Sequence, residues 1–389
     1  MPANLEVAPA LRTEGNSIKY RGFLPELDGL RAIAIMLVFL HHFWPHRYLE
    51  SAGGALARMG WVGVDLFFVL SGFLIAGILL DSRESPTYFR SFYIRRTLRI
   101  FPLYYGALTA QVLLMLVIKG GIRYQELVQW GEPWWFYAYL GNVKVTIQSA
   151  WPPTEFFVPL WSLQVEEQFY LIFPLVVLYC EPRLLKRLLW IAIIASPLLR
   201  TVLLLMFPEN HHLNYVLLPC RVDGLAWGAQ IAVYLRTGLP SISRGSLALV
   251  TAMFIVAAIA VLRFGGYGWA GSLNRTVGYS ATSLAFAALL LWTLNGQQRP
   301  ETAWLRAKPV LYVGRISYGL YLLQEPGSVV AAAILRAAGT PLPSDGVALA
   351  VLRFATTISL ATMSFYMLER PLLRLKDRFA PSSSSSPST

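Results

Sequence analysis

The sequence predicts an all-α protein, a polytopic transmembrane helical bundle with about ten spans. Composition is the first reason: 56% of the 389 residues are hydrophobic and 14% are charged, with a mean hydropathy of +0.51. Soluble domains are less apolar and about one quarter charged. The second reason is that apolar stretches of about 20 residues, the length that crosses a bilayer as a helix, recur along the whole chain.

The predicted spans follow one another from residue 29 onwards. The ten stretches are 29–45, 61–80, 101–118, 161–180, 187–207, 216–235, 246–263, 276–294, 310–335 and 347–368. A further aromatic stretch, 134–140, is short, and hydropathy alone does not decide whether it crosses the membrane. We find neither an internal repeat nor a second, soluble domain.

The distribution of Lys and Arg predicts the orientation of these spans, because cytoplasmic loops retain positive charge. Six basic segments occur, at 12–21, 83–99, 183–187, 236–244, 299–308 and 370–378. All six lie on one side only if 134–140 does not cross. This topology places the protein in the cell (inner or cytoplasmic) membrane, with both termini cytoplasmic and residues 119–160 on the outer side. Residues 1–23 are then a cytosolic tail, 24–372 the transmembrane domain, and the serine-rich 373–389 a disordered cytosolic tail.

Several functional classes are disfavoured by the composition. The net charge of +12 is accounted for by cytoplasmic loops of a protein in contact with membrane lipids, and no basic-aromatic module indicates nucleic acid. Cys180 and Cys220 have neither CxxC spacing nor a nearby ligand set, so we expect no disulfide framework and no metal. We also expect no bound cofactor. The sequence carries no indication of the oligomeric state.

The first predicted span carries the most informative pair of residues. Arg31 and His42 are eleven positions apart, and everything between Arg31 and His41 is apolar. On a helix, eleven steps bring His42 to within about 20° of Arg31 and about 16 Å along the same face, whereas His41 lies about 80° away. Ionisable residues in a membrane helix are expensive and therefore indicate function. Asp28, one turn before Arg31, is placed to orient the guanidinium group.

Two adjacent carboxylates, Glu166 and Glu167, open the fourth span in WSLQVEEQFY. They could complement the helix dipole, since acidic residues are favourable near a helix N-terminus. Alternatively, one of them lies inside the bundle, where it would orient and stabilise a histidine that acts as a general base. Because adjacent residues point in different directions on a helix, only one of the two is expected to serve the site.

Three arginines, Arg95, Arg96 and Arg99, precede the third span. They could simply be a positive-inside cluster, or the i, i+4 pair of Arg95 and Arg99 could bind a phosphate group. Asp65 lies in an apolar run, where an acidic residue usually has a partner or a role. Elsewhere, Ser71-Gly72 is expected to be a close helix-packing point, and Arg221 and Asp223 form either a local ion pair or a site.

Taken together and in order, the motifs resemble the acyltransferase-3 family of integral membrane O-acyltransferases, which includes O-antigen and exopolysaccharide O-acetylases. The motifs are LDGLRAIAIMLVFLHH, GVDLFFVLSGFLI, RRTLRIFPLYY, WSLQVEEQFYLIFP, RVDGLAWG, ISYGLYLL and LERPLL, and they extend over residues 23–370. One departure is Gln324, which stands where the family often has His.

This resemblance implies that residues 24–372 are an acyltransferase domain. It would transfer an acyl group, acetyl in the simplest case, from cytoplasmic acyl-CoA to a hydroxyl of a carbohydrate, a lipid-linked glycan or a related acceptor. By position, Arg31 and His42 match the family's essential Arg-x10-His pair. Arg95, Arg96 and Arg99 match the basic motif that serves the donor, and Glu166 and Glu167 match the acidic motif.

The mechanism expected from these residues is direct acyl transfer. Arg31 and the three later arginines bind the phosphates of coenzyme A, His42 takes the proton of the acceptor hydroxyl, and Glu166 or Glu167 holds the imidazole. An acyl-histidine intermediate is the alternative route. The competing class is a proton-coupled or solute transporter, in which Asp65, Arg31 and His42 line a path through the bundle.

Overall fold

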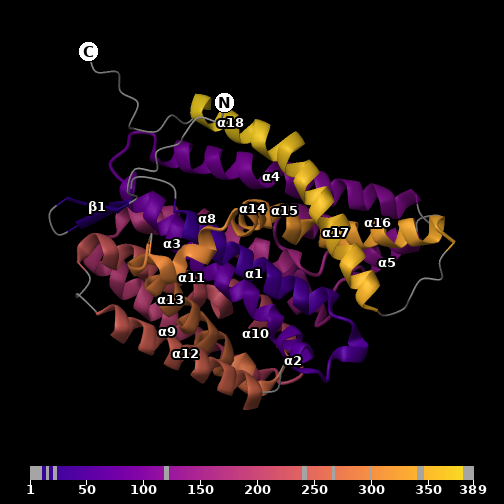
Figure 1. The fold of residues 1–389 in the computed structure, drawn as a ribbon, viewed down its shortest axis with the longest axis horizontal. Coiled ribbons are helices and arrows are strands. Elements are labelled where there is room, and N and C mark those ends of the chain that lie inside the picture. Colours follow the sequence, from indigo (N-terminus) through magenta and orange to yellow (C-terminus); the bar gives the residue numbers. More distant parts are fainter. Residues whose placement is uncertain are drawn as a thin grey trace.

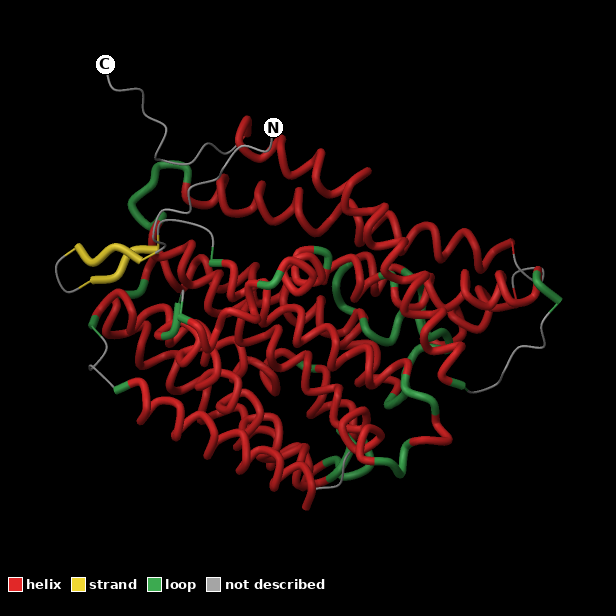
Figure 2. The backbone as a smooth tube through the Cα atoms, in the orientation of Figure 1, coloured by secondary structure: helices red, strands yellow, loops and turns green. Residues whose placement is uncertain are grey.

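The computed structural model describes residues 11–14, 17–20, 24–117, 122–238, 243–264, 268–297, 299–339 and 346–379. Figures 1 and 2 show that these residues are almost entirely helical. An antiparallel hairpin of β1 (Leu11–Glu14) and β2 (Ser17–Tyr20) precedes the helices. It falls within the predicted N-terminal tail, whose other residues lie outside the described ranges.

The helices come in two halves along the chain. The first half comprises α1 (Pro25–Phe43), α2 (Ala52–Met59), α3 (Gly63–Asp81), α4 (Tyr88–Val117), α5 (Ile122–Trp130), α6 (Trp134–Tyr137), α7 (Gly141–Gln148), α8 (Leu160–Tyr179) and α9 (Pro182–Met206). The second comprises α10 (His211–Val216), α11 (Leu218–Thr237), α12 (Arg244–Phe264), α13 (Tyr279–Asn295), α14 (Lys308–Arg315), α15 (Ser317–Leu322), α16 (Gln324–Ala337), α17 (Val347–Ser364) and α18 (Arg370–Phe379). Short 3-10 or π turns occupy His46–Tyr48, Gly60–Val62, Asn274–Gly278, Pro300–Arg306 and Phe365–Glu369.

Within the described ranges, seven helical segments are long and apolar enough to cross a membrane: Gly53–Asp81, Tyr88–Val117, Pro182–Met206, His211–Thr237, Arg244–Phe264, Asn274–Asn295 and Val347–Leu375. The prediction of an all-α polytopic bundle is thus confirmed. The three remaining predicted spans correspond to α1, α8 and the series α14–α16, which are helical but carry more polar residues. These less apolar helices contribute much of the site described below.

The centre of the bundle is formed by α3 and α11. Their backbones approach closely at two glycines, since a Cβ at Gly72 would overlap the carbonyl oxygen of Leu225, and one at Gly228 would overlap that of Val69. Small residues permit such close packing of membrane helices. The predicted packing point at Ser71-Gly72 is confirmed, and α1, α8 and α13 pack around this central pair.

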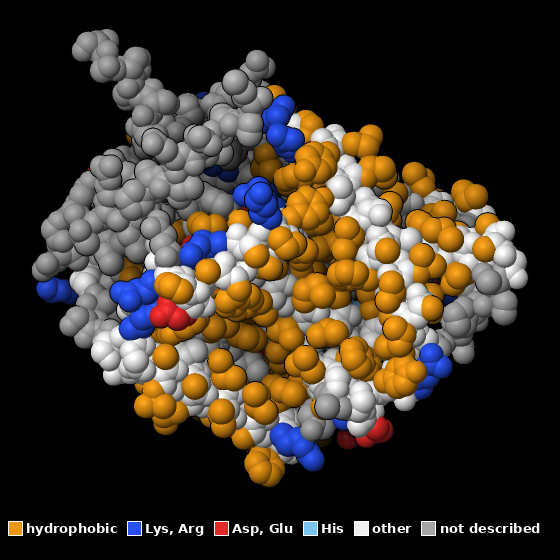
Figure 3. Space-filling model, viewed as in Figure 1, with side chains coloured by type: hydrophobic (Ala, Val, Ile, Leu, Met, Phe, Trp, Pro, Cys, Tyr) orange, Lys and Arg blue, Asp and Glu red, His pale blue; other side chains and the backbone are white. Residues whose placement is uncertain are grey.

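The outer helices α4, α9, α12 and α17 expose much of their apolar surface. Figure 3 shows a broad hydrophobic face, with Lys and Arg side chains gathered toward its edges. A contiguous apolar surface of this size is incompatible with water and suits the acyl chains of a bilayer. The chain is therefore a multi-pass membrane protein.

The segment 134–140 contains only the four-residue helix α6, about 6 Å long, which is far too short to cross a bilayer. The segment is attached to α4 instead. The hydroxyl of Tyr104 donates to the carbonyl oxygen of Phe136 at 2.9 Å, and that of Tyr105 donates to Tyr137 at 3.1 Å. Hydropathy left this stretch undecided, and the structure assigns it to the side of the bundle as a set of short helices.

Two predicted boundaries are wrong. The stretch 310–335 was expected to be one span, but Ile316 and Leu323 interrupt it and divide it into α14, α15 and α16. Such breaks are tolerated in a membrane where protein surrounds them, and Ile316 is fully buried. In addition, α18 extends to Phe379, so the helix continues past residue 373, where a disordered tail was expected. Residues 380–389 lie outside the described ranges.

Candidate active site

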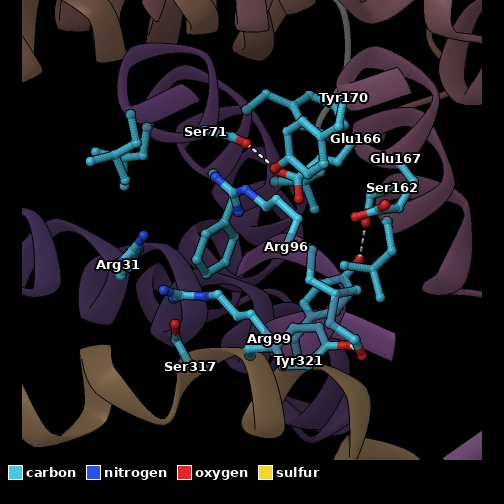
Figure 4. A pocket seen from close by; sticks show the side chains of 18 residues that line it. Arg31, Ser71, Arg96, Arg99, Ser162, Glu166, Glu167, Tyr170, Ser317 and Tyr321 are labelled. Atoms are coloured by element: carbon cyan, nitrogen blue, oxygen red, sulfur yellow. Dashed lines mark hydrogen bonds between the residues drawn. The ribbon is translucent and has the colours of Figure 1, made fainter. Parts of the chain in front are cut away.

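Three arginine side chains point into one cavity between α1, α3, α4, α8 and α15, as Figure 4 shows. The cavity contains about 830 Å³ of space between protein atoms, part of it open to the exterior. Arg31 enters from α1, and Arg96 and Arg99 enter from α4. We call this space the arginine cavity. Its polar lining also includes Ser71, Ser162, Glu166, Glu167, Tyr170, Ser317, Tyr318 and Tyr321.

Arg31 is held by the acidic residue one turn before it. Its Nη1 donates to Oδ1 of Asp28 at 2.9 Å, and the Asp28 carboxylate also lies 3.8 Å from Nε of Arg315. The backbone at Asp28 is fixed as well, because a Cβ at Gly314 of α14 would overlap its carbonyl oxygen. The contact between Asp28 and Arg31 is the one that the sequence spacing predicts. Its role in binding a donor stays a prediction.

On α4, Arg96 and Arg99 line the cavity, whereas Arg95 is not part of its lining. Along a helix, Arg95 and Arg96 lie on opposite sides of Arg99, at about 40° and 60° from it. The cavity lies on the Arg96 side. The guanidinium of Arg96 also stacks over the ring of Tyr170, 4.7 Å from its centroid. The arginine pair that faces the site is therefore i, i+3 rather than the predicted i, i+4.

Glu166 and Glu167 both line the arginine cavity. The sequence analysis placed them at the start of a span, level with His42. However, α8 begins at Leu160, so Glu166 lies about 9 Å inside the helix, whereas His42 is one residue from the end of α1. The carboxylates therefore lie deeper than expected, among arginines rather than beside the imidazole.

Four polar residues of this cavity were not predicted as site residues. Ser71 and Tyr170 share a short hydroxyl–hydroxyl hydrogen bond, and Ser162 lies 2.7 Å from the hydroxyl of Tyr321; Figure 4 marks both contacts. A signal for part of this set was present in the sequence. Ser162, Glu166 and Tyr170 recur every four residues, which places them on one face of α8.

A second cavity lies at the end of α1, with about 500 Å³ of space between protein atoms. We call it the histidine cavity, because His41 and His42 both line it, their ring centroids 5.3 Å apart. The remainder of its lining is strongly aromatic, with Trp61, Trp151, Trp161, Tyr215, Trp269 and Tyr321. Trp151 and Trp269 are only partly buried and meet edge to face at 73°.

The two histidines are held differently. Nδ1 of His41 lies 3.2 Å from the carbonyl oxygen of Ala57 in α2, whereas His42 is exposed in the lining of the cavity. Both cavities share two lining residues, Val64 of α3 and Tyr321 of α15. The arginine and histidine cavities are thus neighbours along α1, with Arg31 in one and His42 in the other.

Asp65 lines neither cavity. Its Oδ1 accepts from Nη2 of Arg221 at 2.5 Å and its Oδ2 accepts from the hydroxyl of Thr282, all deeply buried. A second buried ion pair joins Arg200 to Asp223 at 3.1 Å. Arg221 and Asp223 therefore each pair with a residue of another helix, and the local ion pair considered from the sequence is not the arrangement observed. The placement of Asp65 beside a donor is not what the structure contains.

Gln324, the departure from the family pattern, begins α16 and is buried. Among the residues that the structure describes, its side-chain amide has no hydrogen-bond partner. A glutamine amide cannot accept a proton near neutral pH as an imidazole does. The sequence analysis assigned Gln324 no proton-transfer role.

Comparison with known proteins identifies the family. Residues 24–366 match the model of the acyltransferase domain family, and the chain belongs to that family. Among similar proteins is the peptidoglycan O-acetyltransferase OatA of Listeria monocytogenes, 28% identical over 90% of this chain and 56% of the relative. The O-acetyltransferase OatA of Staphylococcus aureus is 27% identical over 78% of this chain and 50% of its own length.

A putative acetyltransferase of Acidianus two-tailed virus is 26% identical and is matched over more of its length, with 78% of this chain and 82% of the relative aligned. The chain spans about half the length of the two OatA relatives. No solved structure matches it. The resemblance drawn from the motifs is confirmed at the level of the family.

Proposed function

We propose that this chain is a membrane-bound O-acyltransferase that moves an acetyl group from acetyl-CoA to a hydroxyl of a cell-wall or other surface glycan. The observation that carries the proposal is the pair of adjoining cavities, one lined by arginines and the other by histidines and aromatic rings. The family match and the names of the relatives support the same reaction class.

The arginine cavity suits the donor. Coenzyme A carries several phosphate negative charges, and guanidinium groups form strong bidentate hydrogen bonds with phosphate oxygens. Arg31, Arg96 and Arg99 would bind these phosphates, with Asp28 holding Arg31 in place. The cytoplasm supplies acyl-CoA, so this cavity would open on the cytoplasmic side, in agreement with the orientation that the basic loops predict.

The histidine cavity suits a glycan acceptor. Aromatic faces pack against the apolar C–H surface of a sugar ring, and the partly buried Trp151 and Trp269 provide two such faces at an angle. Polar sugar hydroxyls would then lie close to the imidazoles of His41 and His42. Peptidoglycan, the substrate named for the Listeria relative, is the first acceptor to test.

The reaction would proceed as a direct displacement. His42 removes the proton from the acceptor hydroxyl while its oxygen attacks the thioester carbonyl. A carbon–oxygen bond forms and the carbon–sulfur bond breaks, releasing the thiolate of coenzyme A. The proton held by the imidazole then passes to the thiolate sulfur, which restores neutral His42 and completes the balance.

The test is transfer of label from radiolabelled acetyl-CoA to peptidoglycan strands in membranes that contain the full chain, with His42→Ala as the comparison. We expect label in the glycan fraction of the wild type and its loss in the variant. No labelled product with peptidoglycan or with other glycans of the host envelope would contradict the proposal. Flux of a solute into sealed vesicles without any acyl donor would favour the transporter instead.

A further inference from the structure

Two side chains separate the arginine cavity from the histidine cavity. Val64 of α3 and Tyr321 of α15 line both spaces, and each is 6% exposed. Under the proposed function, phosphates held at Arg31 and a proton acceptor at His42 are about 16 Å apart along α1. The acyl end of the donor must therefore pass between these two side chains to reach His42.

Tyr321 is fixed from two directions. Its hydroxyl donates to the carbonyl oxygen of Pro159 at 2.9 Å and lies 2.7 Å from Oγ of Ser162, both at the start of α8. Its ring meets the ring of Phe67 edge to face, with centroids 6.3 Å apart. A tyrosine held at both its hydroxyl and its ring cannot swing aside without breaking buried hydrogen bonds.

Val64 is fixed through its neighbour in the chain. A Cβ at Gly63 would overlap the carbonyl oxygen of Ala34, so this turn of α3 lies directly against the backbone of α1. Val64 itself has a branched side chain with few rotamers in a helix. The opposite side of the passage is therefore also rigid, and neither wall can retreat to admit a longer group.

We propose that Val64 and Tyr321 form a size-selective passage that restricts transfer to short acyl groups, of which acetyl fits best. This inference rests on the proposed function and adds the residues that determine donor specificity. Pockets that discriminate by methylene groups typically separate substrates by about 10- to 200-fold per methylene. Widening the passage should therefore change the preference between acyl donors more than the overall activity.

The experiment compares acetyl-CoA with butyryl-CoA as donors for the full chain in membranes, with the ratio of the two transfer rates as the readout. Val64→Ala should raise the butyryl-to-acetyl ratio by about tenfold or more, because it removes two methyl groups from the passage. Val64→Phe should lower both rates, and butyryl transfer more strongly. Val158→Ala is the matched control, since Val158 lines only the histidine cavity, and it should leave the ratio unchanged.

The outcomes separate the inference from the proposed function. An unchanged ratio in Val64→Ala, with acetyl transfer intact, would overturn the size-selective passage and leave the acyltransferase function standing. No acetyl transfer by the wild type would overturn the function and the inference with it. If Val64→Ala does not fold, Tyr321→Phe tests the same point, because it frees the ring from Pro159 and Ser162 and should also raise the ratio.

Discussion

Nδ1 of His41 lies 3.2 Å from the carbonyl oxygen of Ala57, while the neighbouring His42 is exposed where it lines the same cavity. A carbonyl oxygen only accepts hydrogen bonds, so this contact keeps a proton on Nδ1 of His41. The contact ties α1 to α2 and orients the ring. His42 is left to face the cavity, which is the arrangement expected of the residue that meets the acceptor.

His42→Ala should lower acyl transfer by about 10²- to 10⁴-fold, the usual contribution of a general base. His41→Ala should retain a substantial fraction of activity, because its ring supports the cavity wall without being the base. Transfer rates of the two variants in membranes, at matched expression levels, check this prediction. Equal losses in both variants would contradict the assignment of the base to His42.

Arg99→Ala should weaken the binding of coenzyme A by about tenfold or more, since a hydrogen bond to a charged group contributes about 1.5–3 kcal/mol. Arg95→Ala is the matched control, one helical turn away on α4 and outside the cavity lining. Its effect should be clearly smaller. Calorimetric titration of the purified protein with coenzyme A measures both, and equal weakening would show that the cavity does not mark the phosphate site.

Glu166→Gln should raise KM for acyl-CoA, because Glu166 lies with Arg31, Arg96 and Arg99 and its charge influences how they are arranged. The pH at which kcat is half-maximal should stay the same to within about half a unit, as expected if the carboxylate does not touch the catalytic imidazole. A pH–rate profile of the variant provides the measurement. A shift of a full unit would instead support the hypothesis that this carboxylate orients His42.

Asp65→Asn should destabilise the protein by about 3–5 kcal/mol, because it leaves Arg221 buried without its countercharge. The more exposed pair of Asp81 and Arg236 is the control, and Asp81→Asn should cost at most about 1 kcal/mol. Thermal unfolding in detergent compares the two variants. Loss of donor binding in a fully stable Asp65→Asn protein would return Asp65 to the site.

The sequence predicts those features that depend on neighbours along one helix. The apolar run between Arg31 and His41 indicates a membrane helix, and α1 contains both Arg31 and His42. The spacing of Asp28 and Arg31 likewise predicts their contact, because residues three apart lie side by side on a helix. Such relationships need only the period of the helix and no knowledge of the rest of the fold.

Features that depend on packing between distant helices could not be predicted. Asp65 finds Arg221 across 156 positions, and Ser162 finds Tyr321 across 159. Their pairing depends on which helix faces pack together, which composition and periodicity leave open. The depth of Glu166 was misjudged for a related reason, since the start of α8 at Leu160 is set by the preceding loop and not by the acidic pair itself.

The central claim is that the two cavities divide the reaction, with donor binding in one and proton transfer in the other. Steady-state kinetics of acetyl transfer by purified wild type, Arg99→Ala and His42→Ala test it most directly. Arg99→Ala should raise KM for acetyl-CoA with a smaller change in kcat, and His42→Ala should lower kcat with KM nearly unchanged. The opposite pattern, or one parameter changed alike in both variants, would contradict the division.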